Sequence, residues 1–230
     1  MTDTETPTTA DVPLPGYPVI VEARLDEPLN RWLWLVKWIL AIPHVVVLVL
    51  LWVVFVVLTV VAGVSIVFTG RYPRGIFDFN VGVMRWTWRV QLYAFTLATD
   101  RYPPFSLQPD PSYPAELEVE YPEQLSRGLV WVKWWLLAIP HYVIIGIFDG
   151  GPHVGGGLIS LLALIAGVTL AVTQRYPTSI FDFIMGMHRW VWRVVSYAAL
   201  MRDEYPPFRI DLGPTEPTAP TTSAATSDPE

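Results

Sequence analysis

The sequence predicts a mainly α-helical integral membrane protein built from two tandem helical-hairpin repeats. Between Trp38 and Phe68 the only ionisable side chain is His44. Apolar runs of about 18 residues or more are typical of membrane spans, because a helix satisfies its own backbone hydrogen bonds inside lipid. The composition agrees, with 52% hydrophobic residues, 11 Trp, 10 Tyr and 10 Phe. The third observation is an internal duplication.

The duplication is visible as motifs of rare residues that recur in one order. They are Arg-Tyr-Pro at 71–73 and 175–177, Ile-Phe-Asp-Phe at 76–79 and 180–183, Arg-Trp-x-Trp-Arg at 85–89 and 189–193, and Tyr-Pro-Pro-Phe at 102–105 and 205–208. We therefore divide the chain into a disordered acidic Thr/Pro-rich tail at 1–16, a first membrane repeat at 17–107, a linker at 108–112, a second membrane repeat at 113–212, and a disordered tail at 213–230.

Charge and cysteine content exclude several kinds of function. The formal charge of −6 is carried mainly by the tails and the linker, which leaves no basic surface for nucleic acid. The absence of cysteine excludes disulfides, thiolate metal sites and cysteine nucleophiles. The N-terminal tail lacks the basic and apolar regions of a cleavable signal peptide, so the first apolar run is expected to direct membrane insertion.

Each repeat opens with two short elements. Alternating hydrophobic residues at Val19–Leu25 and Glu116–Tyr121 indicate short extramembrane β-strands. Trp-rich segments with one lysine each follow at 31–42 and 127–139. Tryptophan at the headgroup level beside a long basic side chain is typical of an interfacial helix, whose lysine is expected to reach the headgroups.

A proline and a histidine follow each Trp-rich segment. Pro43 and Pro140 each remove a backbone donor, so we expect a structural kink where the segment meets the apolar run. His44 and His141 come next, where carbonyls freed by the proline need donors. A structural hydrogen bond is favoured there over metal binding or proton transfer, and no metal site is predicted.

The apolar runs differ between the repeats. In the first repeat the run after His44 continues to Phe68, roughly 37 Å of helix, which is enough to cross a bilayer core of about 30 Å with some tilt. In the second, the glycine-rich loop Asp149–Gly157 divides the run into Leu129–Phe148 and Leu158–Thr173. Either each repeat has one bent span, or the run forms a hairpin of two short helices. The bent span is favoured, because the first repeat has no matching turn residue.

Each repeat ends in a helix with a polar stripe, at Phe79–Thr99 and Phe183–Arg202. At 100° per residue, the stripe and the residue just before each helix bring together Asp78, Arg85 and Arg89 in the first repeat and Asp182, Arg189 and Arg193 in the second. Such a helix either lies in the interface with its arginines on headgroups, or crosses the membrane with the stripe buried against the other repeat. Crossing gives about four membrane helices, which is our working prediction.

These six residues are the candidate site. The functional interpretation is a groove for anionic lipid headgroups, or a polar pathway, and the structural alternative is interfacial anchoring of the arginines. Asp78 and Asp182 are the only acids near the arginines, and we also expect them to cap their helices. No nucleophile elbow, zinc-protease motif or carboxylate pair is present, so neither a catalytic residue nor a cofactor is predicted.

The recurring motifs resemble the membrane family called domain of unknown function 4389, with two copies in tandem as in its actinobacterial members. The resemblance covers roughly Tyr17–Leu107 and Tyr113–Leu212. It implies a bacterial membrane protein. The family has no established activity, so the resemblance implies no catalytic residues, and the glycine-rich loop of the second repeat departs from its pattern.

Together these observations predict a non-enzymatic, multi-pass protein of the bacterial cytoplasmic membrane. It would act through membrane lipids, a membrane protein partner or its own copies, as a scaffold or envelope-associated factor. The alternative is a small transporter or channel unit with a polar site between the duplicated halves. A lipid-modifying enzyme that uses His44 and His141 is the third hypothesis.

Overall fold

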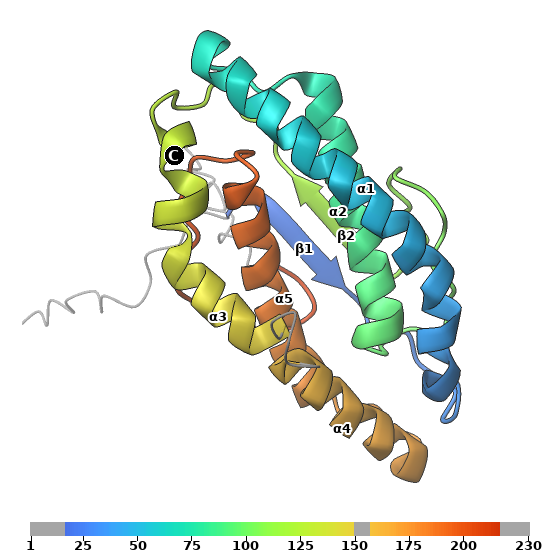
Figure 1. Cartoon of the computed structure of the whole chain (residues 1–230). Coiled ribbons are helices and arrows are strands. Elements are labelled where there is room, and N and C mark those ends of the chain that lie inside the picture. Colours follow the sequence, from blue (N-terminus) through green and yellow to red (C-terminus); the bar gives the residue numbers. More distant parts are fainter. Residues whose placement is uncertain (1–16, 150–156, 217–230) are drawn as a thin grey trace, which may run out of the picture.

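The computed structural model describes residues 17–149 and 157–216, and both predicted tails lie largely outside this range. The described chain is mainly helical with one small sheet (Figure 1). Its elements are β1 (Val19–Ala23), α1 (Trp34–Thr69), α2 (Arg74–Val90), a π-helical turn η1 (Gln91–Phe95), β2 (Ala115–Val119), a 3₁₀ turn η2 (Leu129–Trp131), a π-helical turn η3 (Lys133–Leu137), α3 (Ile139–Asp149), α4 (Leu158–Thr173) and α5 (Thr178–Ala198).

The long apolar run of the first repeat forms a single helix. α1 has 36 residues, which corresponds to about 54 Å. It ends at Gly70, whose left-handed φ of 74° lets its N–H bond to the carbonyl of Ile66 at 2.8 Å. The helix runs from Trp34 through Pro43 without interruption, so the first repeat has no separate interfacial helix ahead of the apolar run.

The second repeat divides the same run, as predicted. The irregular turns η2 and η3 precede α3, and Pro140 is the second residue of that helix. α3 ends at Asp149 and α4 begins at Leu158, so the predicted division is confirmed. The glycine-rich residues 150–156 between them lie outside the described chain. α3 and α4 follow one another in the direction opposite to α1 (Figure 1).

The two predicted strands form an antiparallel pair with Val21 opposite Leu117. Their alternation buries one side, formed by Val19, Val21 and Ala23 in β1 and by the matching residues of β2. Each strand packs against the helix of the other repeat, because β1 contacts α5 and β2 contacts α2. The two repeats therefore exchange their strands.

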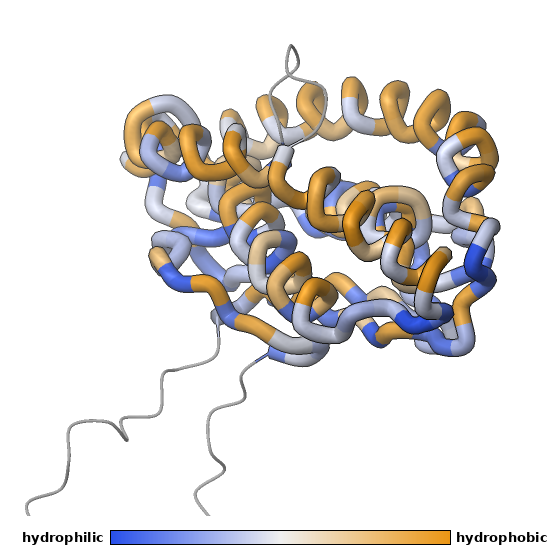
Figure 2. Tube along the Cα trace, turned by 90° about the horizontal axis from the view of Figure 1, so that it is seen from below, coloured by the Kyte–Doolittle hydropathy of each residue, from blue (hydrophilic) through white to orange (hydrophobic). Residues whose placement is uncertain are grey.

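The helices are arranged in layers above this exchanged ribbon. α2 and α5 touch the strands, α1 packs along α2, and α3 and α4 pack on α5. Figure 2 shows the apolar helices gathered on one side of the molecule and the hydrophilic segments on the opposite side. The protein thus has one apolar and one polar face.

One helix in the described chain, α1, is long and apolar enough to cross a membrane. Core helices and signal sequences can meet the same criteria. α3 and α4 are apolar but have only 11 and 16 residues. α2 and α5, which the four-span prediction required, do not meet these criteria. α2 has only 17 residues, and the apolar residues of α5 are interrupted by a polar stripe that is buried inside the protein. A multi-pass arrangement is therefore not supported.

Candidate functional site

The most extended surface feature is the apolar face formed by α1, α3 and α4. Only 17% of the most apolar window of α1 is buried. Large side chains project outward along the whole helix, from Leu35 to Phe68, and Val53 at its middle is 60% exposed. Monomeric soluble proteins rarely expose a contiguous apolar surface of this extent, and such surfaces mark membrane or protein contacts.

The arginines of the predicted site lie beneath this face rather than on a surface. In the first repeat they bind only backbone carbonyls. Arg85 donates to Leu117 at 3.2 Å and Leu107 at 3.0 Å, and Arg89 donates to Ser106 at 3.2 Å and Gln108 at 2.7 Å. Burial lowers the pKa of both guanidinium groups from the ordinary value.

In the second repeat the arginines also reach carboxylates. Arg189 donates to the carbonyl of Val21 at 3.0 Å. Arg193 forms ion pairs with Asp211 at 2.6 Å and Glu216 at 2.7 Å. Glu216 belongs to the segment 213–230 that the sequence assigned to a disordered tail, so that prediction is wrong for the described residues 213–216. A polar composition alone could not show that a buried arginine holds it.

All four arginines are 9% exposed or less. An anionic headgroup would have to displace the bonds just described. Arg85 and Arg189 occupy equivalent positions and each binds a carbonyl of the exchanged strand, Leu117 in β2 and Val21 in β1. In this geometry the arginines hold the two repeats together.

The two aspartates of the predicted site do not cap their helices. The positions before the first helical residues are Pro73 and Pro177, so Asp78 and Asp182 are the fifth residues of α2 and α5. The capping prediction is wrong because each helix begins directly after its proline, one turn earlier than expected. Asp78 instead lines a polar cleft of about 550 Å³ between α2 and β2, together with Arg74, Arg85 and Glu118.

The lysines that were expected to reach the headgroups are buried. Lys37 donates to the carbonyl of Thr99 at 2.7 Å and pairs with Asp100 at 2.8 Å. Lys133 repeats this arrangement with Arg202 and Asp203. The acids lie far along the chain, so no local pattern pairs them with the lysines. One sequence feature could have indicated these ion pairs: an aspartate recurs two residues before Tyr-Pro-Pro-Phe in both repeats.

The two histidines have matching environments. His44 accepts a hydrogen bond at Nδ1 from the Trp86 indole at 3.1 Å, and its ring stacks on Phe105 with centroids 3.9 Å apart. His141, Trp190 and Phe208 repeat this arrangement. The structural role was predicted, but the partner is an indole rather than a freed carbonyl. Among the described residues, no cluster of His, Cys, Asp and Glu could hold a metal ion.

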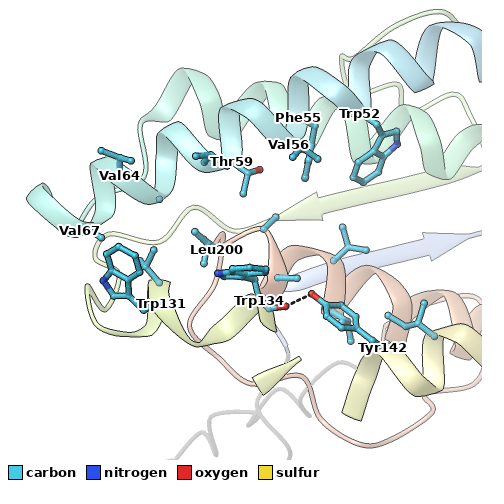
Figure 3. Close-up of a pocket in the computed structure, with 18 of the residues that line it drawn as sticks. Trp52, Phe55, Val56, Thr59, Val64, Val67, Trp131, Trp134, Tyr142 and Leu200 are labelled. Carbon is cyan, nitrogen blue, oxygen red and sulfur yellow. Dashed lines mark hydrogen bonds between the residues drawn. The ribbon is translucent and has the colours of Figure 1, made fainter. Parts of the chain in front are cut away.

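A groove opens between α1 and the start of the second repeat (Figure 3). Its volume is about 750 Å³. Trp52, Phe55 and Val56 of α1 face it from one side, and Trp131, Trp134 and Tyr142 face it from the other. No charged side chain lines it. No local sequence pattern predicts this groove, because its walls come from different repeats.

Comparison with known proteins identifies the family. A family model described as domain of unknown function (DUF4389) matches residues 31–106 and again residues 130–209. No curated protein and no solved structure matches the chain. The two matches together cover more than half of the sequence, and each contains the buried lysine, the histidine after the proline and the two arginines described above. The chain therefore belongs to the DUF4389 family, of which it carries two tandem copies.

Proposed function

We propose that this protein is a membrane-bound scaffold that inserts its apolar face into one leaflet and presents its polar face to the aqueous phase. It acts through lipids and partner proteins rather than through catalysis. One observation supports this proposal. α1, which lies on the apolar face, runs along the same direction as the ribbon of β1 and β2, which lies on the opposite side of the molecule (Figure 1).

The direction of α1 relative to the bilayer follows from its neighbours. The ribbon and α2 run along α1, with α2 between them (Figure 1). Glu116 and Glu118 project from the outer side of the ribbon. If α1 crossed the bilayer, these carboxylates would be drawn toward the hydrocarbon, where each ionised side chain costs about 2.5 kcal/mol or more. An α1 that lies in the plane keeps them in water.

The length of α1 supports the same orientation. Exposed apolar side chains continue from Leu35 to Phe68, which is roughly 50 Å along the helix, whereas the hydrocarbon core is only about 30 Å thick. A helix that crossed would therefore leave apolar side chains in water at one or both ends. A helix that lies in the leaflet keeps all of them in hydrocarbon, while its inner side packs on α2.

The polar interior gives no support to the alternative of transport. The stripes of α2 and α5 are filled by carbonyls and by the carboxylates of Asp211 and Glu216. The histidines of the enzymatic alternative are each enclosed by the aromatic side chains of their own repeat. We therefore propose contact-based function and neither transport nor catalysis.

Cysteine labelling tests the orientation directly, because the chain has no native cysteine. Arg31→Cys and Arg71→Cys place exposed thiols at the two ends of α1, and Val53→Cys places one at its middle. In vesicles, an impermeant maleimide should label both end positions from the same side and leave position 53 unlabelled. Glu118→Cys is the control and should react from that same side. Labelling of the two ends from opposite sides would show that α1 crosses the membrane.

A further inference from the structure

We propose that the apolar groove between α1 and the second repeat holds one hydrocarbon chain of a bilayer lipid. The inference rests on the proposed membrane face, because the groove opens between two helices of that face. Val60 and Trp134 on its rim are both more than half exposed, whereas Leu200 on its floor is 6% exposed. The groove is therefore a recess that leads inward from the apolar surface.

The lining offers nothing that would attract a polar ligand. Its two polar side chains outside the indoles are already engaged. The Thr59 hydroxyl accepts a hydrogen bond from Asn80 at 3.2 Å, and the Tyr142 hydroxyl donates to the carbonyl of Trp134 at 2.7 Å (Figure 3). Water in such a groove would find few polar partners. Hydrocarbon is the remaining solvent in a bilayer, and it restores the dispersion contacts that an empty groove would lack.

The dimensions favour a single chain over a helix of a partner protein. The groove follows α1 from Trp52 to Phe68, roughly 24 Å at 1.5 Å per residue. A helix about 10 Å wide and 24 Å long occupies about 1,900 Å³. That is more than the empty space of about 1600 Å³ in and directly above the groove, so a helix does not fit into it, whereas an extended alkyl chain of that length does.

The groove lies at one of two places that the duplication makes equivalent, and the sequence explains why it is open there. The motif Val-Lys-Trp at 36–38 and 132–134 makes Val130 the counterpart of Trp34. Trp34 is buried, and its indole would lie 3.2 Å from a Cβ added at Gly167 of α4. At the equivalent position Val130 faces Gly63 of α1 with only a short side chain. The space beside Gly63 therefore stays open, whereas the indole of Trp34 fills the equivalent space beside Gly167.

Photolabelling from the lipid phase tests this proposal on the full-length protein. We would reconstitute it in phosphatidylglycerol vesicles that contain phosphatidylcholine with a diazirine at the end of one acyl chain. Trypsin cleavage after Arg193 and Arg202 releases the floor as residues 194–202. Cleavage after Lys37 and Arg71 releases most of α1 as residues 38–71. Mass spectrometry then reports on the floor by itself through the peptide 194–202, while the peptide 38–71 reports on the outer face of α1 together with the α1 wall of the groove.

Two tryptophan substitutions provide the comparison. Val130→Trp supplies the indole that Trp34 supplies in the other half, and it should abolish labelling of the floor peptide while labelling of the α1 peptide persists. Val143→Trp adds the same indole on the exposed side of α3, outside the groove, and should leave floor labelling unchanged. Ala198→Phe narrows the groove from the α5 wall and should act like Val130→Trp, which guards against misfolding of a single variant.

The outcomes separate the two proposals. If the α1 peptide is labelled but the floor peptide is not, the groove holds no chain and the membrane face stands. If floor labelling persists in both Val130→Trp and Ala198→Phe, the label reaches the floor by another route and the inference is overturned. If neither peptide is labelled in the unmodified protein, the proposed membrane face itself is wrong.

Discussion

Replacing His188 with methionine should remove a defined part of the protein's sensitivity to acid. His188 lies in α5, is 1% exposed, and contacts the first repeat on two sides. Its Nε2 is 3.2 Å from the Thr96 hydroxyl, and the Trp88 ring lies 4.8 Å away. Among the described residues, no charged side chain forms a hydrogen bond or an ion pair with it. Protonation would thus place a positive charge in the core between the repeats.

The magnitude follows from the pKa. Burial lowers the pKa of His188 from 6.5 to about 3. The unfolded chain binds the proton more tightly, so the free energy of unfolding falls as the pH drops through the range from about 6.5 to about 3. At about pH 4 the loss is about 3 kcal/mol, at 1.36 kcal/mol for each pH unit below 6.5. The buried carboxyl of Glu216 has a raised pKa and acts in the opposite direction.

Thermal unfolding of both proteins in detergent, followed by near-UV circular dichroism at about pH 7 and about pH 4, measures the difference. Met84 occupies the equivalent position in the first repeat and is fully buried, so His188→Met introduces a side chain that this fold already accommodates. Loss of the contact with Thr96 changes the stability by the same amount at both pH values. For each protein we take the change in unfolding temperature between about pH 7 and about pH 4. The difference between these two changes is free of the effect of Glu216 and of the other acids, which both proteins share. If acid lowers the unfolding temperature of both proteins by the same amount, His188 is not the source of this acid sensitivity.

Two further predictions concern the packing between segments. Arg193→Met removes the nearest cation from two largely buried carboxylates, Asp211 and Glu216, which keep only their ion pairs with Arg209 and Arg189, and it should lower the free energy of unfolding by about 3 kcal/mol. Arg89→Met frees only carbonyls and should cost less, about 1–2 kcal/mol. Equal losses in denaturant titrations would contradict this. In Gly82→Ala the new Cβ would lie 2.8 Å from the Leu107 Cβ and 3.0 Å from its carbonyl oxygen, so a loss of about 1–3 kcal/mol is expected. Gly75→Ala meets open space and should be neutral or stabilise by up to about 1 kcal/mol, and a loss there would show that helix geometry, not crowding, governs both sites.

The features that the sequence predicted well depend on local periodicity and on repetition. The duplicated motifs located both repeats, the alternating residues located both strands, and the glycine-rich loop marked the division between α3 and α4. The 3.6-residue period also placed Arg85 and Arg89 on one stripe. For the strands, the loop and the stripe the information lies within about 20 neighbouring residues, where helix and strand geometry determine which side chains share a face. The repeats are located by motifs that recur in the same order in both halves.

The features that it missed depend on partners distant in the chain. A helical stripe shows which arginines point together, but not whether they meet headgroups or carbonyls, and here the carbonyl of Leu117 comes from the other repeat. The same holds for Lys37 and Asp100. Four spans were predicted because a polar stripe was assumed to require either lipid headgroups or a membrane interior. In the structure, Arg85 and Arg189 of the stripes instead donate hydrogen bonds to backbone carbonyls of the exchanged strands.

The exchanged strands also make each repeat dependent on the other. A chain cut in the linker at 108–112 would leave α2 without β2 and α5 without β1, and the carbonyl bonds of Arg85 and Arg189 to those strands would be lost together. Because every such contact occurs twice with the roles of the halves reversed, two identical single repeats could form the same contacts across a two-fold axis. A one-repeat relative would therefore be expected to fold as an intertwined homodimer, and the linker of this chain joins the two halves of such an arrangement covalently.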